Sequence, residues 1–283
     1  MSQAFQSQRF ELKYLVNPAQ TLEMREFMKA YLELDDYGVG QTDFAYPVHS
    51  VYMDSDSLDT YRDTLNGTKN RFKLRLRYYD DRPDTPVFFE VKGRVDNCIL
   101  KQRCGVRREA VSLVMAGQLP DQSQLISRDP RHMVAIQRFN RLLLKLNAKP
   151  KAHNSYLREA WVSPNDNSVR VTFDRNVRIE PYFKMDAPVE FIHPVSIFAD
   201  SVILELKFTN RFPDWLKVLV RAFNLPWTAA AKYAGGVLIM GEHFFHDGEK
   251  GLDWQRHLPH ELIPDAAVSQ FRGNQLDAET VYE

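Results

Sequence analysis

Basic residues recur at every second position in several strand-like segments of this chain. In RFKLRLRYY, Lys73, Arg75 and Arg77 alternate with two leucines. Because successive side chains of a strand point to opposite faces, the three basic residues share one face and the leucines occupy the other. Arginine offers forked donors to phosphate oxygens, and lysine supplies a point charge. Such a face favours the binding of a phosphate chain.

The same alternation returns in six further segments. Three of them pair an acid with a lysine, as Glu11 with Lys13, Glu90 with Lys92, and Glu205 with Lys207. The others align Lys101 with Arg103, Tyr156 with Arg158, and Arg170 with Thr172 and Asp174. One such strand is typical of a half-buried sheet with its polar face in water. Seven strands that concentrate lysine and arginine indicate instead a barrel whose charged faces point inward.

An interior of this kind needs an anionic occupant. Clustered lysines and arginines repel one another, and a phosphate chain supplies the missing counter-charge. The glutamates suit either salt bridges to the lysines or coordination of Mg²⁺ or Mn²⁺, which bridge phosphate oxygens in phosphoryl transfer. The chain has no G-x-x-x-x-G-K-[ST] motif. The pattern therefore predicts a phosphoryl-transfer site without a P-loop.

Composition narrows the remaining classes. The 283 residues include 37 basic and 37 acidic residues, and this balance gives no support for a nucleic-acid binder. We expect Cys98 and Cys104 to be reduced thiols, since no second pair of metal ligands accompanies them. The start of the chain lacks a signal-peptide run, and no stretch approaches the ~20 apolar residues of a membrane helix. We therefore expect a cytoplasmic protein.

Periodicity and turn residues predict an α+β fold, an antiparallel β-barrel of about eight strands with flanking helices. The expected strands lie near 8–16, 48–54, 70–80, 86–94, 98–109, 154–162, 168–174, 178–184 and 201–208. Helices are expected from Pro18 to about residue 34, over 130–147 and from Pro213, with a short helix after HSVYMD capped by Asp56 or Ser57. We expect one domain over 8–245 and a partly disordered C-terminal extension over 246–283.

Nine short motifs in order resemble the polyphosphate polymerase domain of the vacuolar transporter chaperone (VTC) family. They are ELKY, HSVYMDSDSLDTY, KLRLRYY, FEVKG, LKQR, YLR, VRVTFD, LELKF and AAAKYAGG, from about residue 8 to residue 240. That family belongs to the CYTH-like triphosphate tunnel metalloenzymes. The resemblance implies an eight-stranded antiparallel tunnel and suggests a compact, stand-alone, bacterial version of the domain.

The resemblance also implies roles for individual residues. The matching phosphate-binding and catalytic positions are Lys13, Arg75, Arg77, Lys92, Lys101, Arg158, Arg170 and Lys232. Tyr156, Arg103 and Lys207 are expected to bind substrate, and Glu205 matches the metal ligand, with Glu11 and Glu90 as further candidates. Two positions depart from the family pattern. Arg9 stands where many relatives of the wider superfamily carry a glutamate, and Ala231 stands in place of a serine.

The leading hypothesis is an ATP–polyphosphate phosphotransferase that moves the γ-phosphoryl group of ATP onto a polyphosphate chain with Mn²⁺ or Mg²⁺. By family analogy, a separate membrane protein is the expected partner. The first alternative is hydrolysis of tripolyphosphate or a nucleoside triphosphate in the same tunnel, with Glu11 or Glu90 orienting water. The second is a non-catalytic module that binds polyphosphate.

Overall fold

Antiparallel strands dominate the computed structural model, which describes residues 9–95, 98–164, 166 and 168–246. The strands are β1 (Arg9–Val16), β2 (Glu33–Leu34), β3 (Ala45–Asp54), β4 (Arg71–Tyr78), β5 (Val87–Val95), β6 (Cys98–Val106), β7 (Lys149–Val162), β8 (Val169–Pro181), β9 (Val195–Ser196) and β10 (Val202–Thr209). They form one sheet in the order β1-β10-β8-β7-β3-β4-β5-β6, with β2 added to β7 and β9 added to β8. All of the pairings are antiparallel.

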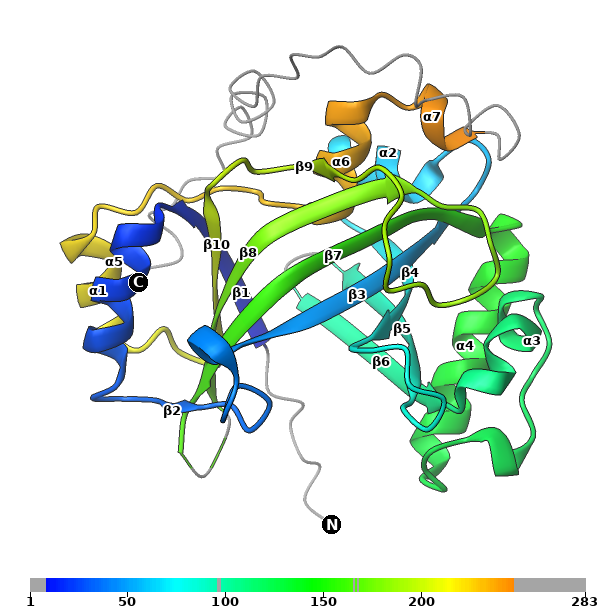
Figure 1. The fold of residues 1–283 in the computed structure, drawn as a ribbon, viewed down its shortest axis with the longest axis horizontal. Helices are drawn as coiled ribbons and strands as arrows, with labels where there is room; N and C mark the ends of the chain where they lie inside the picture. Colours follow the sequence, from blue (N-terminus) through cyan, green and yellow to red (C-terminus); the bar gives the residue numbers. More distant parts are fainter. Residues whose placement is uncertain (1–8, 96–97, 165, 167, 247–283) are drawn as a thin grey trace.

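The helices are α1 (Pro18–Met28), α2 (Asp59–Leu65), α3 (Val111–Met115), α4 (Pro130–Leu146), α5 (Asp214–Ala222), α6 (Lys232–Met240) and α7 (His243–His246). Helices α1 and α5 lie on one side of the curved sheet, α3 and α4 lie on the opposite side, and α2, α6 and α7 gather at one end (Figure 1). None of the helices in the described ranges is long and apolar enough to cross a membrane.

The sheet curls until its two edge strands, β1 and β6, approach each other. Among the described residues no hydrogen-bonded ladder joins these edges. An ion pair crosses near the gap instead, between Lys92 Nζ and Glu11 Oε2 at 2.9 Å. The α+β class and the large antiparallel sheet are therefore confirmed, whereas closure into a barrel is not present as strand pairing.

The apolar faces of the strands are covered by the outer helices. On β4, Leu74 and Leu76 are fully buried, and they belong to a cluster with Ile136 and Phe139 of α4. The rings of Phe89 and Phe139 meet edge to face with centroids 5.0 Å apart. Full burial of a side chain of this size stabilises the fold by roughly 1.5–3 kcal/mol. This packing fixes which face of the sheet is left for the charged residues.

A second apolar cluster holds α1 and α5 against β1, β8 and β10. It includes Met24 of α1, Leu216 of α5 and Leu206 of β10, all fully buried. Helix α1 begins as expected, because Asn17, which precedes Pro18, forms a reciprocal capping box with Gln20 in the first turn. It ends at Met28, so the prediction of a helix to residue 34 was wrong. Glu33–Leu34 pair with β7 as a short strand instead.

Strand boundaries differ from the prediction in two further places. The expected strands at 168–174 and 178–184 are one strand, β8. The Arg175-Asn176 pair resembles a turn, but Asn176 adopts φ 53° within the strand. The register with β7 shifts there, so the extra residue makes a β-bulge rather than a chain reversal. Strand β7 also begins five residues before its expected start, at Lys149.

The short helix α2 is capped by a different residue from those expected. Asp54, at the end of β3, accepts hydrogen bonds from the backbone of Thr60 (3.0 Å) and Tyr61 (3.0 Å). Its Oδ2 also accepts the Tyr233 hydroxyl of α6 at 3.0 Å. The prediction of a cap at Asp56 or Ser57 was therefore wrong. Asp54 joins β3, α2 and α6 at one end of the sheet.

The cysteine prediction is tested at one position. Cys104 is a buried free thiol, and burial raises its pKa to about 11. The side chain of Cys98 lies outside the described residues, as does the C-terminal extension from residue 247 onward.

Candidate functional site

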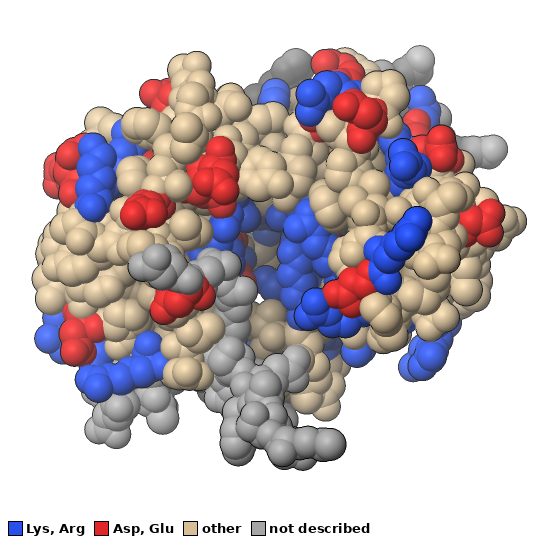
Figure 2. All heavy atoms as spheres, turned by 90° about the horizontal axis from the view of Figure 1, so that it is seen from below, with Lys and Arg blue, Asp and Glu red and all other residues tan. Residues whose placement is uncertain are grey.

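Charged side chains of the strands gather on the concave face of the sheet. Seen from below, the molecule is hollowed between its two helical sides, and lysine and arginine side chains gather in the hollow (Figure 2). The alternation predicted for β4 is confirmed, since Leu74 and Leu76 are buried under α4 while Arg75 contacts Glu90 of β5 and Tyr52 of β3. We call this concave face the basic interior.

Glu205 on β10 lies at the centre of the most crowded cluster in the basic interior. Its carboxylate lies 3.2 Å from Lys13 Nζ, 2.5 Å from Lys207 Nζ and 3.2 Å from Lys232 Nζ. Arg158 Nη2 is 3.4 Å away. Burial would raise the pKa of Glu205, but the surrounding cations hold it well below its usual range. Glu205 is therefore an anion that four cations share.

Asp174 on β8 extends this cluster. It accepts a forked pair of hydrogen bonds from Arg158 at 2.7 Å each, and it lies 2.6 Å from Lys232 Nζ. Lys232 reaches the cluster from the first turn of α6, and its Nζ sits 4.6 Å from the centroid of the Tyr156 ring. Burial opposes ionisation of Asp174, but Arg158 and Lys232 keep its pKa low. Sequence alternation placed Asp174 on this face without giving it a role.

A second cluster surrounds Glu90 on β5. Arg75 contacts Oε2 through Nε at 2.8 Å and Nη2 at 2.7 Å, and Lys101 lies 2.8 Å from Oε1. Arg103 Nε is 3.5 Å from the same oxygen. The Glu90 side chain is fully buried, and the cations hold its pKa well below the ordinary value despite that burial. Glu90 of β5 therefore holds Arg75 of β4 close to Lys101 and Arg103 of β6.

Two cations of the interior have no acidic partner among the described residues. Arg77 is 6% exposed, and the one hydrogen bond that its side chain makes within the described residues is from Nη2 to Ser50 Oγ at 3.3 Å. Lys73 forms no ion pair with any described residue. Burial, together with repulsion from the neighbouring cations Lys13 and Lys92, lowers its pKa to about 7. An unpaired charge of this kind is costly unless a ligand neutralises it.

Arg170 lies near the start of β8, at the end of the strand away from Ile179 and α6. Its guanidinium lies 2.6 Å from Asp35 and 3.5 Å from the Tyr46 hydroxyl. Sequence reasoning missed Asp35, which follows β2 in a loop without strand alternation. It also missed Tyr52, whose hydroxyl accepts from Arg75 at 3.3 Å. The alternation of Ser50 and Tyr52 within β3 was the available signal for the second residue.

The candidate metal ligands Glu11, Glu90 and Glu205 all offer carboxylate oxygens. Carboxylate oxygens suit Mg²⁺ and Mn²⁺. Glu11 and Glu205 flank one ammonium, since each lies 3.2 Å from Lys13 Nζ. Glu90 belongs to the other cluster. The described ranges contain no group of three or more acidic, histidine or cysteine side chains arranged to hold a metal ion. Glu205 and Glu11 therefore supply two carboxylates beside the Lys13 ammonium, and a divalent cation there would need further oxygen ligands, such as those of bound phosphates.

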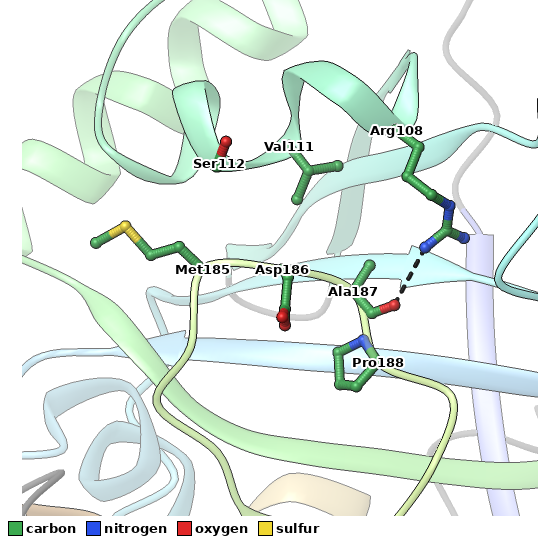
Figure 3. Close-up of a pocket in the computed structure, with 7 residues that line it drawn as sticks. All are labelled: Arg108, Val111, Ser112, Met185, Asp186, Ala187 and Pro188. Atoms are coloured by element: carbon green, nitrogen blue, oxygen red, sulfur yellow. Dashed lines mark hydrogen bonds between the residues drawn. The ribbon is translucent and has the colours of Figure 1, made fainter. Parts of the chain in front are cut away.

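A separate pocket lies on the outside of the sheet (Figure 3). It has a volume of about 230 Å³ and lies between the start of α3 and the loop around Met185. Arg108 donates to the Ala187 carbonyl across it at 3.1 Å, and the hydroxyl of Tyr78 donates to the Pro188 carbonyl beneath it. None of the predicted site residues lines this pocket.

The fold and the site define an α+β protein whose curved antiparallel sheet holds a basic interior. Residues 8–240 match the VTC domain family. Since this match covers most of the chain, the protein belongs to that family. The resemblance drawn from the nine motifs is confirmed.

Two curated relatives are subunits of one complex in Schizosaccharomyces pombe. Vacuolar transporter chaperone complex subunit 4 is 22% identical over 248 residues, which cover 74% of this chain and 34% of the relative. Vacuolar transporter chaperone complex subunit 2 is 21% identical over 184 residues, covering 59% of this chain and 25% of the relative. The chain thus spans about a third or less of the length of these relatives.

Two solved structures are similar over most of this chain. A putative adenylate cyclase from Bacillus halodurans aligns over 79% of this chain and 95% of its own, with a TM-score of 0.44 and 11% identity. A protein from Pyrococcus horikoshii OT3 aligns over 81% of this chain and 98% of its own, with a TM-score of 0.41 and 14% identity.

Proposed function

We propose that the basic interior binds a chain of phosphates and that the protein transfers the γ-phosphoryl group of ATP to polyphosphate. The observation that supports this most directly is the excess of cations that converge on one buried face. Arg77 and Lys73 lack acidic partners among the described residues, and the carboxylates present are each shared by several cations. A phosphate chain would supply the missing negative charge along the whole face, making the curved sheet a phosphate tunnel.

The residues divide into positioning and charge-stabilising roles in this proposal. Arg75, Arg77, Arg158 and Arg170 would hold phosphate oxygens through forked donors, and Lys13, Lys92, Lys101 and Lys232 through single charges. Three further side chains would contact the bound polyphosphate: Tyr156, Arg103 and Lys207. The acceptor is already an anionic phosphate oxygen, so the transfer needs no strong general base. Holding the two phosphates in line and neutralising the developing charge carries the catalysis.

Glu205 and Glu11 would hold Mn²⁺ or Mg²⁺ together with phosphate oxygens. Such a cation supplies charge stabilisation to the phosphoryl group during transfer. Glu90 is tied to Arg75 and Lys101 on the other side of the interior. We propose that Glu90 mainly positions these two cations, and it remains a further candidate for a metal ligand. In the competing hydrolase, Glu11 or Glu90 would orient water.

Incubation with γ-labelled ATP and Mn²⁺, followed by sizing of the products on a gel, tests the proposal. A ladder of labelled polyphosphate is expected. Free phosphate alone would instead establish the hydrolase, and unchanged ATP with retained polyphosphate binding would establish a non-catalytic module. The matched variants are Lys232→Met, in the interior, and Lys29→Met, on the exposed surface of α1's C-terminal end. Only the first should abolish the ladder.

The metal assignment has its own test in Glu205→Gln. This change keeps the shape but removes the charge, so turnover should fall by a factor on the order of 10². Binding of tripolyphosphate without metal should stay level or tighten, because one negative charge leaves a site that holds anions. Unchanged turnover would exclude Glu205 as an essential metal ligand. Weakened metal-free binding would show that Glu205 mainly positions Lys207 and Lys232.

The setting of the reaction is carried over from the family. The match to two subunits of a vacuolar transporter chaperone complex supports assembly with partner proteins. We propose that this partner is a separate membrane protein, which would hold the domain at the cytoplasmic side of a membrane. Co-purification of the full chain with membrane proteins from its own cells would check this. Nucleic acid has no place in the proposal, because the basic residues of the proposed site lie on the concave face of the sheet and the net charge is zero.

A further inference from the structure

Aromatic rings crowd together at one end of the basic interior. Tyr37 lies 5.6 Å from Tyr46 and 5.7 Å from Tyr79, measured between ring centroids. Tyr79 in turn meets Phe88 edge to face at 6.3 Å. Tyr37 and Tyr79 are stacked, with an interplanar angle of 17°. We call these four residues the aromatic rim.

The rim adjoins the cations of the interior directly. Tyr46 is the second residue of β3, Tyr79 follows the last residue of β4 and Phe88 is the second residue of β5, so antiparallel pairing puts the three at the same end of the sheet. The Tyr46 hydroxyl lies 3.5 Å from Arg170 Nη2. The guanidinium of Arg103 sits 3.4 Å from the centroid of the Phe88 ring.

Tyr37 is the exposed member of the rim. It is 63% exposed, whereas Tyr46 beneath it is 7% exposed. Its loop is held to the interior, because Asp35 accepts the Tyr37 amide at 2.9 Å and pairs with Arg170 at 2.6 Å. The ring is therefore supported from below and anchored through its backbone, yet most of its own surface remains available. Tyr46 contacts both the Tyr37 ring and Arg170.

We propose that the aromatic rim is a subsite for the base of a nucleoside triphosphate, which stacks on Tyr37 while the phosphates enter the basic interior past Arg170. This inference rests on the proposed function, since it gives the phosphate donor a binding orientation. Stacking on an aromatic ring accepts any base with a π-face. The rim therefore adds affinity for nucleotides over bare phosphate chains and discriminates little between adenine and guanine.

The test compares three ligands on three proteins without turnover, in the absence of divalent metal. ATP, GTP and tripolyphosphate are titrated into the wild type, Tyr37→Ala and Tyr37→Phe by calorimetry. In Tyr37→Ala both nucleotides should bind about fivefold to a hundredfold more weakly, with tripolyphosphate within twofold of wild type. Tyr37→Phe should retain nucleotide affinity. Tyr31→Ala is the matched control, because Tyr31 is also an exposed tyrosine but stacks on Trp215 at the outer helices.

Two results would overturn the inference in different ways. Unchanged ATP binding by Tyr37→Ala, with tripolyphosphate still bound, would remove the base subsite and leave the phosphate site standing. An equal loss for all three ligands would also overturn it, because the tyrosine would then support the phosphate site rather than the base. A wild-type protein that binds neither ATP nor tripolyphosphate would overturn the proposed function itself.

Discussion

Arg75 and Arg77 occupy equivalent places on one strand but have different partners. Arg75 is paired with the buried carboxylate of Glu90, while Arg77 forms no direct ion pair in the described part of the chain and acts on Glu90 only from a greater distance. Sequence spacing treats the two as equals, because it reports the face of a strand and not what stands opposite. The carboxylates of the interior thus act as internal counter-charges for some cations and leave others open to a ligand.

This difference predicts opposite effects on the stability of the empty protein. Arg75→Ala removes the closest partner of a buried carboxylate, although Lys101 and Arg103 remain near it. We expect a loss of about 1–3 kcal/mol in the free energy of unfolding. Arg77→Ala removes an unpaired buried charge and should change stability by less than about 1 kcal/mol, or raise it. Urea unfolding without ligand measures both, and equal losses would contradict the assignment.

Lys73 gives the site a pH dependence with a definite sign. Its pKa of about 7 in the empty protein means that it is largely neutral at about pH 8.5, where terminal phosphates are already ionised. A bound phosphate chain favours the charged form and raises that pKa. Binding should therefore take up protons, and affinity should fall as pH rises above about 7.

Calorimetry at about pH 8.5 in two buffers of different ionisation enthalpy measures this uptake. Lys73→Met should lower the number of protons bound per tripolyphosphate. It should not abolish the uptake, because Lys207, with a pKa lowered by burial to about 8, also titrates in this range. Proton uptake that is the same in wild type and Lys73→Met would show that the phosphates do not reach Lys73.

At the scale of whole elements, the faces of the strands could be predicted from the sequence, but the bulge in β8 and helix α6 could not. Alternation of charged and apolar residues identified the inner faces of β1, β4, β5, β6, β7, β8 and β10, because one face of each strand must pack under helices. The bulge at Asn176 was missed, since its sequence also suits a turn. Helix α6 was not identified, although Lys232 at its start was named from the family resemblance.

Helix α6 owes its position to small residues that let it approach the sheet. Gly236 faces Ile179 of β8, and an ideal Cβ there would lie 2.4 Å from Cδ1 and 2.8 Å from Cγ2 of that side chain. Gly236→Ala should therefore push the helix away and destabilise the protein by about 1–3 kcal/mol. It should also weaken phosphate binding, because Lys232 starts the same helix.

Thermal unfolding and tripolyphosphate titration of this variant measure the two effects. The double variant Gly236→Ala with Ile179→Val is the control for the steric cause, since shortening the side chain makes room for the added methyl group. It should recover part of both losses. A fully stable Gly236→Ala protein would show that α6 has room to spare at this contact.

At the scale of the molecule, the two edge strands of the curved sheet determine whether the interior is closed along its length. Hydrogen-bonded ladders join all neighbouring strands in the order β1-β10-β8-β7-β3-β4-β5-β6. The two edge strands, β1 and β6, approach each other without such a ladder in the described residues. The missing ladder between β1 and β6 could not be predicted from the sequence, because the alternation of side chains is the same in an open sheet and in a closed barrel. Lys13 on β1 and Lys101 on β6 carry charge on both sides of the opening.

A phosphate chain that contacts both lysines would draw the two edges together, and this predicts a measurable change in backbone protection. Unpaired amides at a sheet edge exchange faster than paired ones. Hydrogen exchange followed by mass spectrometry should therefore show slower exchange in β1 and β6 when tripolyphosphate is bound. Peptides from α4, which packs on the outer face, serve as the internal reference and should change little. Saturating binding with unchanged exchange at both edges would mean that an open sheet holds the ligand, and Lys101→Met would then have no more effect on affinity than the surface change Lys29→Met.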